Sequence, residues 1–137
     1  MNLYSFITQH DPTLNLIIEK EFPDKRCVGG KYSMETHSIT LFQRDIQIQC
    51  KRALGSLERL EEYSLIVCSH ELGHALDKTL PHLSEELALT GNLDILYKIE
   101  VNAWNIAEKL IPFTSRELFL KIREESLFHC RKRPLVS

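Results

Sequence analysis

The sequence lacks the features that mark secreted and membrane-spanning proteins. Its four cysteines, Cys27, Cys50, Cys68 and Cys130, form no Cys-x-x-Cys pair and suggest no disulfide framework. No basic start is followed by a long apolar run, and no stretch approaches the roughly 20 apolar residues of a membrane span. We therefore expect a cytoplasmic protein with reduced thiols and no membrane association.

An excess of charge of one sign is missing as well. Seventeen basic and nineteen acidic residues leave a formal net charge of −2, which gives no general attraction to nucleic acid or to anionic lipid. The one basic run, Arg131-Lys132-Arg133, lies at a predicted helix end, where it complements the helix dipole. We expect no direct nucleic-acid binding.

No repeat, low-complexity segment or linker interrupts the 137 residues, which predicts a single domain over residues 1–137. A chain with 43% apolar and 26% charged residues can bury a core of its own. The patterns below predict an α+β fold that is mostly helical, with a small antiparallel sheet near the N-terminus packed on two long helices.

The individual elements follow from periodicity and from turn residues. Alternation over 36–42 predicts a half-buried strand, which pairs with a shorter strand near 27–33. Helical spacing, together with cap and stop residues, predicts helices at about 12–21, 46–60, 62–78 and 93–111. The residues between Pro81 and the turn at 90–92 are predicted to form a loop. Thr114 and Glu117 form a capping box for a last helix.

The chemistry is concentrated in residues 70–74, which read His-Glu-Leu-Gly-His. On a helix, positions i and i+4 lie one turn apart on one face, so His70 and His74 can bind one zinc ion. Glu71 lies beside them and can take a proton from a water activated by zinc and pass it to a leaving amine. The spacing predicts a zinc site, and two histidines leave that site incomplete.

The third ligand must come from another part of the chain. One known extension places a histidine at position 80 after a glycine at position 77, and here these positions are Leu80 and Asp77. Glu100 interrupts an otherwise apolar helix face, and a buried carboxylate needs a cation nearby. The alternative is that Glu100 lies at the edge of this face, in water or paired with Arg or Lys. Four residues in or beside the predicted loop remain rivals: Glu85, Glu86, Asp94 and His82.

Three further residues are candidates for supporting roles, and each has a simpler alternative. Asp77 lies one turn beyond His74 and could orient a histidine, or it could be a solvated acid. His37 could stabilise a developing oxyanion, or it could be a core histidine of its strand. Tyr97, one turn before Glu100, could serve the oxyanion too, or it could simply pack.

The two long helices together resemble the ImmA/IrrE-like metallopeptidase family. Its members carry a His-Glu-x-x-His helix, followed roughly 25–30 residues later by a Glu-x-x-Ala-x-x-x-Ala-x-x-Leu-Leu-x-Pro-like helix. The motif at 70–74 matches, and the segment 100–112 looks like the second part, at an offset of 100 − 74 = 26 residues. The resemblance covers roughly residues 25–112, with its specificity concentrated in the two helices.

The resemblance implies a zincin-like active-site helix, a second ligand helix carrying Glu100, and a zinc-dependent intracellular endopeptidase, a hydrolase. Such proteins are typically encoded with phages, other mobile elements or stress responses. Those studied act on, or through, a transcriptional repressor, so the implied partner is a protein substrate of that kind. An alternative is a zinc-containing binding module that acts by contact with a regulator. A helical DNA-binding regulator is a third reading, for which the neutral charge balance is poor support.

Overall fold

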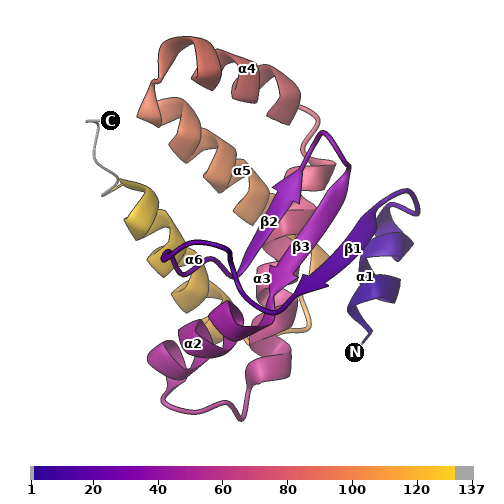
Figure 1. The fold of residues 1–137 in the computed structure, drawn as a ribbon, viewed down its shortest axis with the longest axis vertical. Helices are drawn as coiled ribbons and strands as arrows, with labels where there is room; N and C mark the ends of the chain where they lie inside the picture. The colour runs from indigo at the N-terminus through magenta and orange to yellow at the C-terminus, as the bar shows by residue number, and fades with distance from the viewer. Residues whose placement is uncertain (1, 132–137) are drawn as a thin grey trace. The chain divides into compact units, whose positions relative to one another are not determined.

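The computed structural model describes residues 2–131, which form an α+β fold made mostly of helices (Figure 1). This confirms the predicted fold class. The elements in chain order are α1 (Leu3–His10), β1 (Asn15–Glu19), β2 (Gly30–Ser33), β3 (Ser38–Phe42), α2 (Gln43–Leu54), α3 (Leu60–Leu76), α4 (Leu80–Thr90), α5 (Leu93–Leu110) and α6 (Arg116–Arg131). Of the predicted basic run, Lys132 and Arg133 lie outside the described residues.

The chain divides into two compact units, Met1–Leu72 and Gly73–Ser137, and the division falls inside α3. The first unit holds the sheet, α1, α2 and the larger part of α3, and the second holds the remaining turn of α3 with α4, α5 and α6. Because α3 is one continuous helix, helix geometry fixes the spacing of its own residues across the division. A single domain over the whole chain stays a prediction.

The sheet of the first unit is mixed. Its strand order is β1-β3-β2, with β2 antiparallel to β3, as predicted, and β1 parallel to β3. The prediction of a half-buried β3 is wrong, because every residue of this central strand is buried. The polar side chains of β3, those of Ser38 and Thr40, are short and are buried together with the apolar ones. Ser38 Oγ forms a 2.6 Å hydrogen bond with Thr36 Oγ1, which satisfies this buried hydroxyl.

The predicted helix over residues 12–21 is also wrong, because α1 ends at His10 and residues 15–19 form β1. The Asp11 carboxylate accepts hydrogen bonds from Thr13 N at 2.9 Å and Thr13 Oγ1 at 2.6 Å, which makes a turn instead of a helix start. The β-branched pair Ile17-Ile18 then favours a strand, and pairing with β3 supplies its backbone partners.

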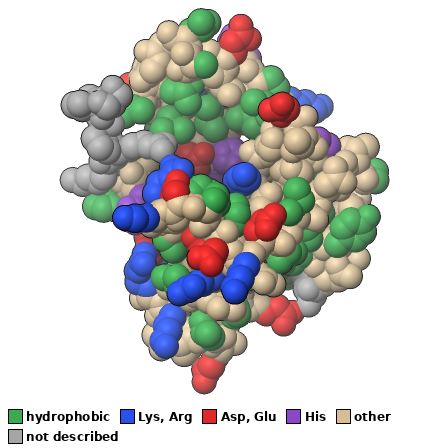
Figure 2. All heavy atoms as spheres, viewed as in Figure 1, with side chains coloured by type: hydrophobic (Ala, Val, Ile, Leu, Met, Phe, Trp, Pro, Cys, Tyr) green, Lys and Arg blue, Asp and Glu red, His purple; other side chains and the backbone are tan. Residues whose placement is uncertain are grey.

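Helix α2 begins directly after β3 and ends earlier than predicted. Gly55 follows it with φ at 77°, and Gly55 N donates to Lys51 O at 2.8 Å, which closes the helix. On the face drawn in Figure 2, basic and acidic side chains lie among one another over α2 and the loop that precedes β2. Two of the basic side chains there form ion pairs, Arg26 with Asp24 at 3.0 Å and Arg44 with Glu21 at 3.9 Å.

Helix α3 confirms the predicted element, but it has no single apolar stripe. Residues 65–74 are buried without interruption, so the helix is covered on all sides over nearly three turns. The polar residues of the motif are therefore in the interior. Burying such groups is unfavourable unless hydrogen bonds, charges or a metal ion compensate, which makes this segment the natural focus for function.

In the second unit, the segment predicted as a loop is helix α4. Pro81 lies in its first turn, where the missing N–H costs nothing, so the proline starts a helix instead of breaking one. Helix α5 confirms its prediction and packs against both α4 and α6 (Figure 1). Trp104 links α5 to α6 through an edge-on contact with Phe119 and a 3.3 Å hydrogen bond to Ser126 Oγ.

The start of α6 lies one residue later than predicted. Ser115 Oγ accepts a 3.2 Å hydrogen bond from Leu118 N, whereas Thr114 Oγ1 donates to Ile111 O at 2.9 Å. Ser115 is therefore the capping residue, because its hydroxyl lies three positions before an unsatisfied N–H of the first turn. Within residues 2–131, no helix has both the length and the hydropathy that spanning a bilayer requires.

Candidate metal centre

His70, Glu71 and His74 form a buried group on α3 that could hold a metal ion. Their ligand atoms lie within 4.8 Å of one another, and the three residues are only 9%, 6% and 9% exposed. Imidazole nitrogens and carboxylate oxygens are the donors that divalent transition metals bind in proteins. The i, i+4 spacing read from the sequence therefore gives a compact set of donors in the folded chain.

Glu71 contacts the first histidine of the motif and the edge of the sheet. Its Oε2 lies 3.2 Å from His70 Nδ1, so the carboxylate can accept a hydrogen bond from that nitrogen and leave His70 Nε2 as the ligating atom. A Cβ added at Gly30, the first residue of β2, would lie 3.1 Å from Glu71 Cγ. The sequence predicted only a short strand near residues 27–33, so this contact of the edge strand with Glu71 was missed.

Glu100 lies beside the second histidine. Its Oε2 is 3.1 Å from His74 Nε2, and its side chain is 21% exposed at the margin of the apolar face of α5. Two ligands bound to one zinc at about 2.1 Å and at a tetrahedral angle lie about 3.4 Å apart. A direct hydrogen bond of His74 to the carboxylate would give a similar distance, so the geometry suits both arrangements.

A close approach between α3 and α5 brings these two residues together. A Cβ added at Gly73 would lie 2.2 Å from Ala103 O and 2.9 Å from Ala103 C, both of them backbone atoms. Glycine therefore lets the two helix backbones approach each other directly next to His74. Ala103 lies one turn after Glu100, so this contact sets the position of the Glu100 carboxylate relative to the imidazole.

The four rival ligands are all on exposed positions. Glu85 and Glu86 lie in α4 and Asp94 lies in the first turn of α5, and all three are exposed. His82, with an 83% exposed side chain, approaches Glu86 at 3.9 Å, which is an ordinary surface pair. Glu100 is half-buried, whereas the rivals are exposed, and it contacts a histidine of the motif.

Asp77 is buried, at 8% exposure, so the alternative of a solvated acid is wrong. It follows the last residue of α3, and its Oδ1 accepts hydrogen bonds from Thr79 N at 2.9 Å and Thr79 Oγ1 at 2.7 Å. Its Oδ2 is buried with no hydrogen-bond partner among the described residues. Asp77 thus shapes the turn from α3 to α4, and its orienting a histidine stays a prediction.

His37 lies in the turn before β3, with φ at 48°, and not in the strand where it was predicted. Its Nε2 lies 3.0 Å from Asp11 Oδ2, and its Nδ1 lies 2.9 Å from the Tyr32 hydroxyl. Hydrogen bonds from Thr13, with a smaller contribution from His37, lower the pKa of Asp11 below 3.8. His37 therefore ties the β2–β3 turn to the segment before β1, and its service to an oxyanion stays a prediction.

Two further residues lie on α5 and α3, the helices that carry Glu100 and the motif. Tyr97 is half-buried on α5, one turn before Glu100. Cys68 is fully buried in α3, where desolvation, with the charge of Glu71 as a second cause, raises the pKa of its thiol to about 12. A thiol of that pKa stays protonated at neutral pH, which favours a packing role for Cys68.

Comparison with known proteins identifies no relative of this chain. No family model matches it, and no curated protein and no solved structure gives a significant match. The residues of the site and their geometry are therefore the basis for a function.

Proposed function

We propose that the protein is a zinc-dependent endopeptidase in which His70, His74 and Glu100 hold the metal ion and Glu71 is the general base. Two observations support the proposal: the Glu100 carboxylate lies 3.1 Å from His74 Nε2, and His74 belongs with His70 and Glu71 to the buried group on α3 that could hold a metal ion. Two imidazoles and one carboxylate are a donor set typical of catalytic zinc, and three protein ligands leave a coordination position open.

Glu100 suits the third ligand position better than Glu71 does. Glu71 Oε2 lies on the Nδ1 side of His70, where a carboxylate orients a ligating histidine. Glu100 Oε2 lies against the Nε2 of His74, which is the atom that a ligating histidine offers when its Nδ1 faces away. In this assignment the Glu100 carboxylate binds the metal ion, and the Glu71 carboxylate remains available for proton transfer.

The chemistry of the chain follows from this assignment. Zinc bound here would supply Lewis acidity, which polarises the carbonyl of the peptide bond. Glu71 takes a proton from the attacking water and passes it to the leaving amine, and its 6% exposure keeps bulk water away from that transfer. Gly30, in the edge strand β2, packs against the residue proposed as the base.

The resemblance to ImmA/IrrE-like metallopeptidases supports the same reaction and adds a substrate class. It favours a cytoplasmic protein substrate such as a transcriptional repressor. The mixed charges on the face of Figure 2 do not form a basic surface there, which agrees with a protein substrate.

The decisive experiment is Glu71→Gln. Glutamine keeps the size of the side chain and an oxygen that can accept from His70 Nδ1, so fold and zinc content should be retained. It cannot take the proton, so the rate of peptide hydrolysis should fall roughly 10²–10⁴-fold. Zinc content and cleavage of the repressor-type substrate are measured on the same preparations.

Glu61→Gln is the matched control, because Glu61 is an exposed carboxylate in the first turn of the same helix. It should leave both the zinc content and the rate unchanged. If Glu71→Gln retained the full biological effect with its zinc in place, the protein would be a binding module that acts by contact, and the peptidase proposal would be wrong.

A further inference from the structure

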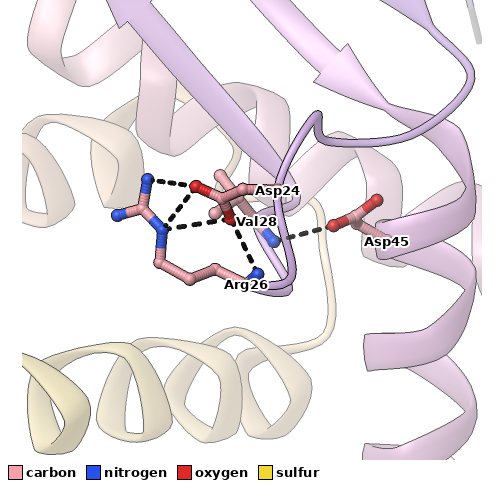
Figure 3. Close-up of polar contacts among 4 residues, drawn as sticks. All are labelled: Asp24, Arg26, Val28 and Asp45. Carbon is pink, nitrogen blue, oxygen red and sulfur yellow. Dashed lines mark hydrogen bonds and ion pairs between the residues drawn. The ribbon is translucent and has the colours of Figure 1, made fainter.

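Asp45 is a buried carboxylate outside the metal motif, in the first turn of α2 and only 6% exposed. Its two oxygens accept hydrogen bonds from two backbone amides of one loop, Oδ1 from Phe22 N at 3.0 Å and Oδ2 from Val28 N at 2.9 Å. Figure 3 shows the bond to Val28. Hydrogen bonds to an ionised, buried acceptor are among the stronger ones in proteins.

The two bonds hold both ends of the loop over residues 22–28. The neighbouring Arg44 N donates to Lys20 O at 2.9 Å, so the start of α2 holds the incoming chain as well. On the far side of the loop the chain enters Gly29, whose carbonyl oxygen accepts from Phe42 N at 2.9 Å. The first turn of α2 thus fixes the path by which the loop enters β2.

That path leads directly to Glu71. The Gly29 position is tight, since an added Cβ would lie 2.7 Å from Gln49 Oε1 and 3.3 Å from an Ile46 side-chain carbon. The next residue, Gly30, packs against Glu71, with an added Cβ only 3.1 Å from Glu71 Cγ. A shift of the loop end would therefore be transmitted along one or two residues to the side chain of the base.

We propose that Asp45 is a positioning residue that holds the start of β2 against Glu71 and keeps this carboxylate buried. The importance of that placement for catalysis rests on the proposed peptidase activity, whereas the placement itself does not. The second carboxylate of the loop, Asp24, provides the contrast. Among residues 2–131 its hydrogen bonds and its ion pair are with Arg26, its near neighbour in the chain, and at 51% side-chain exposure this ion pair contributes little to the fold (Figure 3).

The test compares Asp45→Ala with Asp24→Ala in the zinc-loaded, full-length protein. Amide hydrogen exchange reports on Phe22 and Val28, and carbodiimide labelling followed by mass spectrometry reports on the accessibility of Glu71. Asp45→Ala should speed exchange of the two amides roughly 10- to 100-fold. This factor corresponds to the loss of one hydrogen bond to a charged group at each amide.

Asp45→Ala should also increase labelling of Glu71 several-fold, whereas Asp24→Ala should change neither readout. If Asp45→Ala fails to fold, Asp45→Asn retains one accepting oxygen and should give a smaller change in the same direction. Faster loop exchange with unchanged labelling of Glu71 would make Asp45 an anchor of the loop alone and overturn the proposal.

A rate measurement separates this proposal from the proposed function. If the protein is a peptidase, Asp45→Ala introduced alone should lower the rate of peptide hydrolysis. Added to Glu71→Gln, it should leave the residual rate unchanged, because the effect of Asp45 on the rate depends on Glu71. An equal loss in both backgrounds would also contradict positioning. If neither protein hydrolyses peptides, the peptidase proposal fails, and the labelling of Glu71 still decides the role of Asp45.

Discussion

A single methyl group at Gly73 tests whether the approach of α5 to α3 creates the metal centre. In Gly73→Ala the new Cβ would lie 2.2 Å from Ala103 O and 2.9 Å from Ala103 C. Ordinary contact between carbon and oxygen needs about 3.2 Å or more, so the helices must separate by on the order of 1 Å. A side-chain rotation cannot relieve the contact, because both opposing atoms belong to the backbone.

The separation is large compared with what a metal site tolerates. Metal–ligand distances are held within about 0.2 Å of their ideal values, and Glu100 lies one turn from Ala103 on the helix that must move. We expect the affinity for zinc to fall roughly tenfold or more. The free energy of unfolding should fall by about 1–2 kcal/mol, because the overpacking cost exceeds the gain that alanine normally brings to a helix.

Gly91→Ala is the matched control within the same unit. Gly91 ends α4 with φ at 66°, and nothing lies within 4 Å of an added Cβ, so the substitution strains the backbone without crowding a neighbour. It should cost about 1 kcal/mol of stability and leave zinc binding unchanged. Zinc affinity is measured by competition with a chelator, and stability by denaturant unfolding of the zinc-free proteins.

The two variants therefore separate loss of stability from loss of the site. If Gly73→Ala bound zinc as tightly as the unmodified protein, the proximity of His74 and Glu100 would not depend on this helix contact. The assignment of Glu100 as a zinc ligand would then lose its main geometric support.

Three further results are expected. The purified protein should contain about one zinc per chain, and His70→Ala should lose it. Glu100→Ala should weaken zinc binding, whereas Glu85→Ala should not. Equal effects of Glu100→Ala and Glu85→Ala would mean that the third ligand is another residue. Asp11→Asn should lower stability at neutral pH, where the depressed pKa makes the charged carboxylate stabilising, and the difference should shrink as the pH falls below 3.8; a pH-independent difference would contradict this sign. Cys68, with its pKa near 12, should resist alkylation at pH 8 in the native protein and react on unfolding, as mass spectrometry can show.

The sequence predicted those parts of the fold in which local signals and tertiary packing agree. Helices α3 and α5 are long, and their limits follow from periodicity and from stop residues such as Pro112. The segment after Pro81 was mistaken for a loop because proline breaks a helix interior but suits a first turn. Strand β1 was mistaken for a helix because Asp11 caps a turn as readily as it caps a helix.

The candidate site divides in the same way. The spacing of His70 and His74 is a property of one helix, so the sequence alone predicts that both can reach one ion. The partner of Gly73 is a different matter, because Ala103 lies 30 residues further along the chain (103 − 73 = 30) and only the fold brings the two together. Glu100 could be found from the sequence because it is a charged residue on an otherwise apolar face of one helix. Such a face is expected to pack against the rest of the protein, so the charge indicates a tertiary contact.

Two glycines, Gly30 in β2 and Gly73 within the motif itself, allow close packing beside Glu71 and beside His74. Gly30 lets the edge of the sheet pack against Glu71, and Gly73 lets the backbone of α5 approach the helix beside His74. In both places a side chain would hold the neighbouring backbone away from the motif. The proposed donors are His70, His74 and Glu100, and the glycines that pack beside the motif helix contribute no donor atom. A search for similar sites should therefore consider glycines within the motif helix and glycines packed against it, in addition to the ligands.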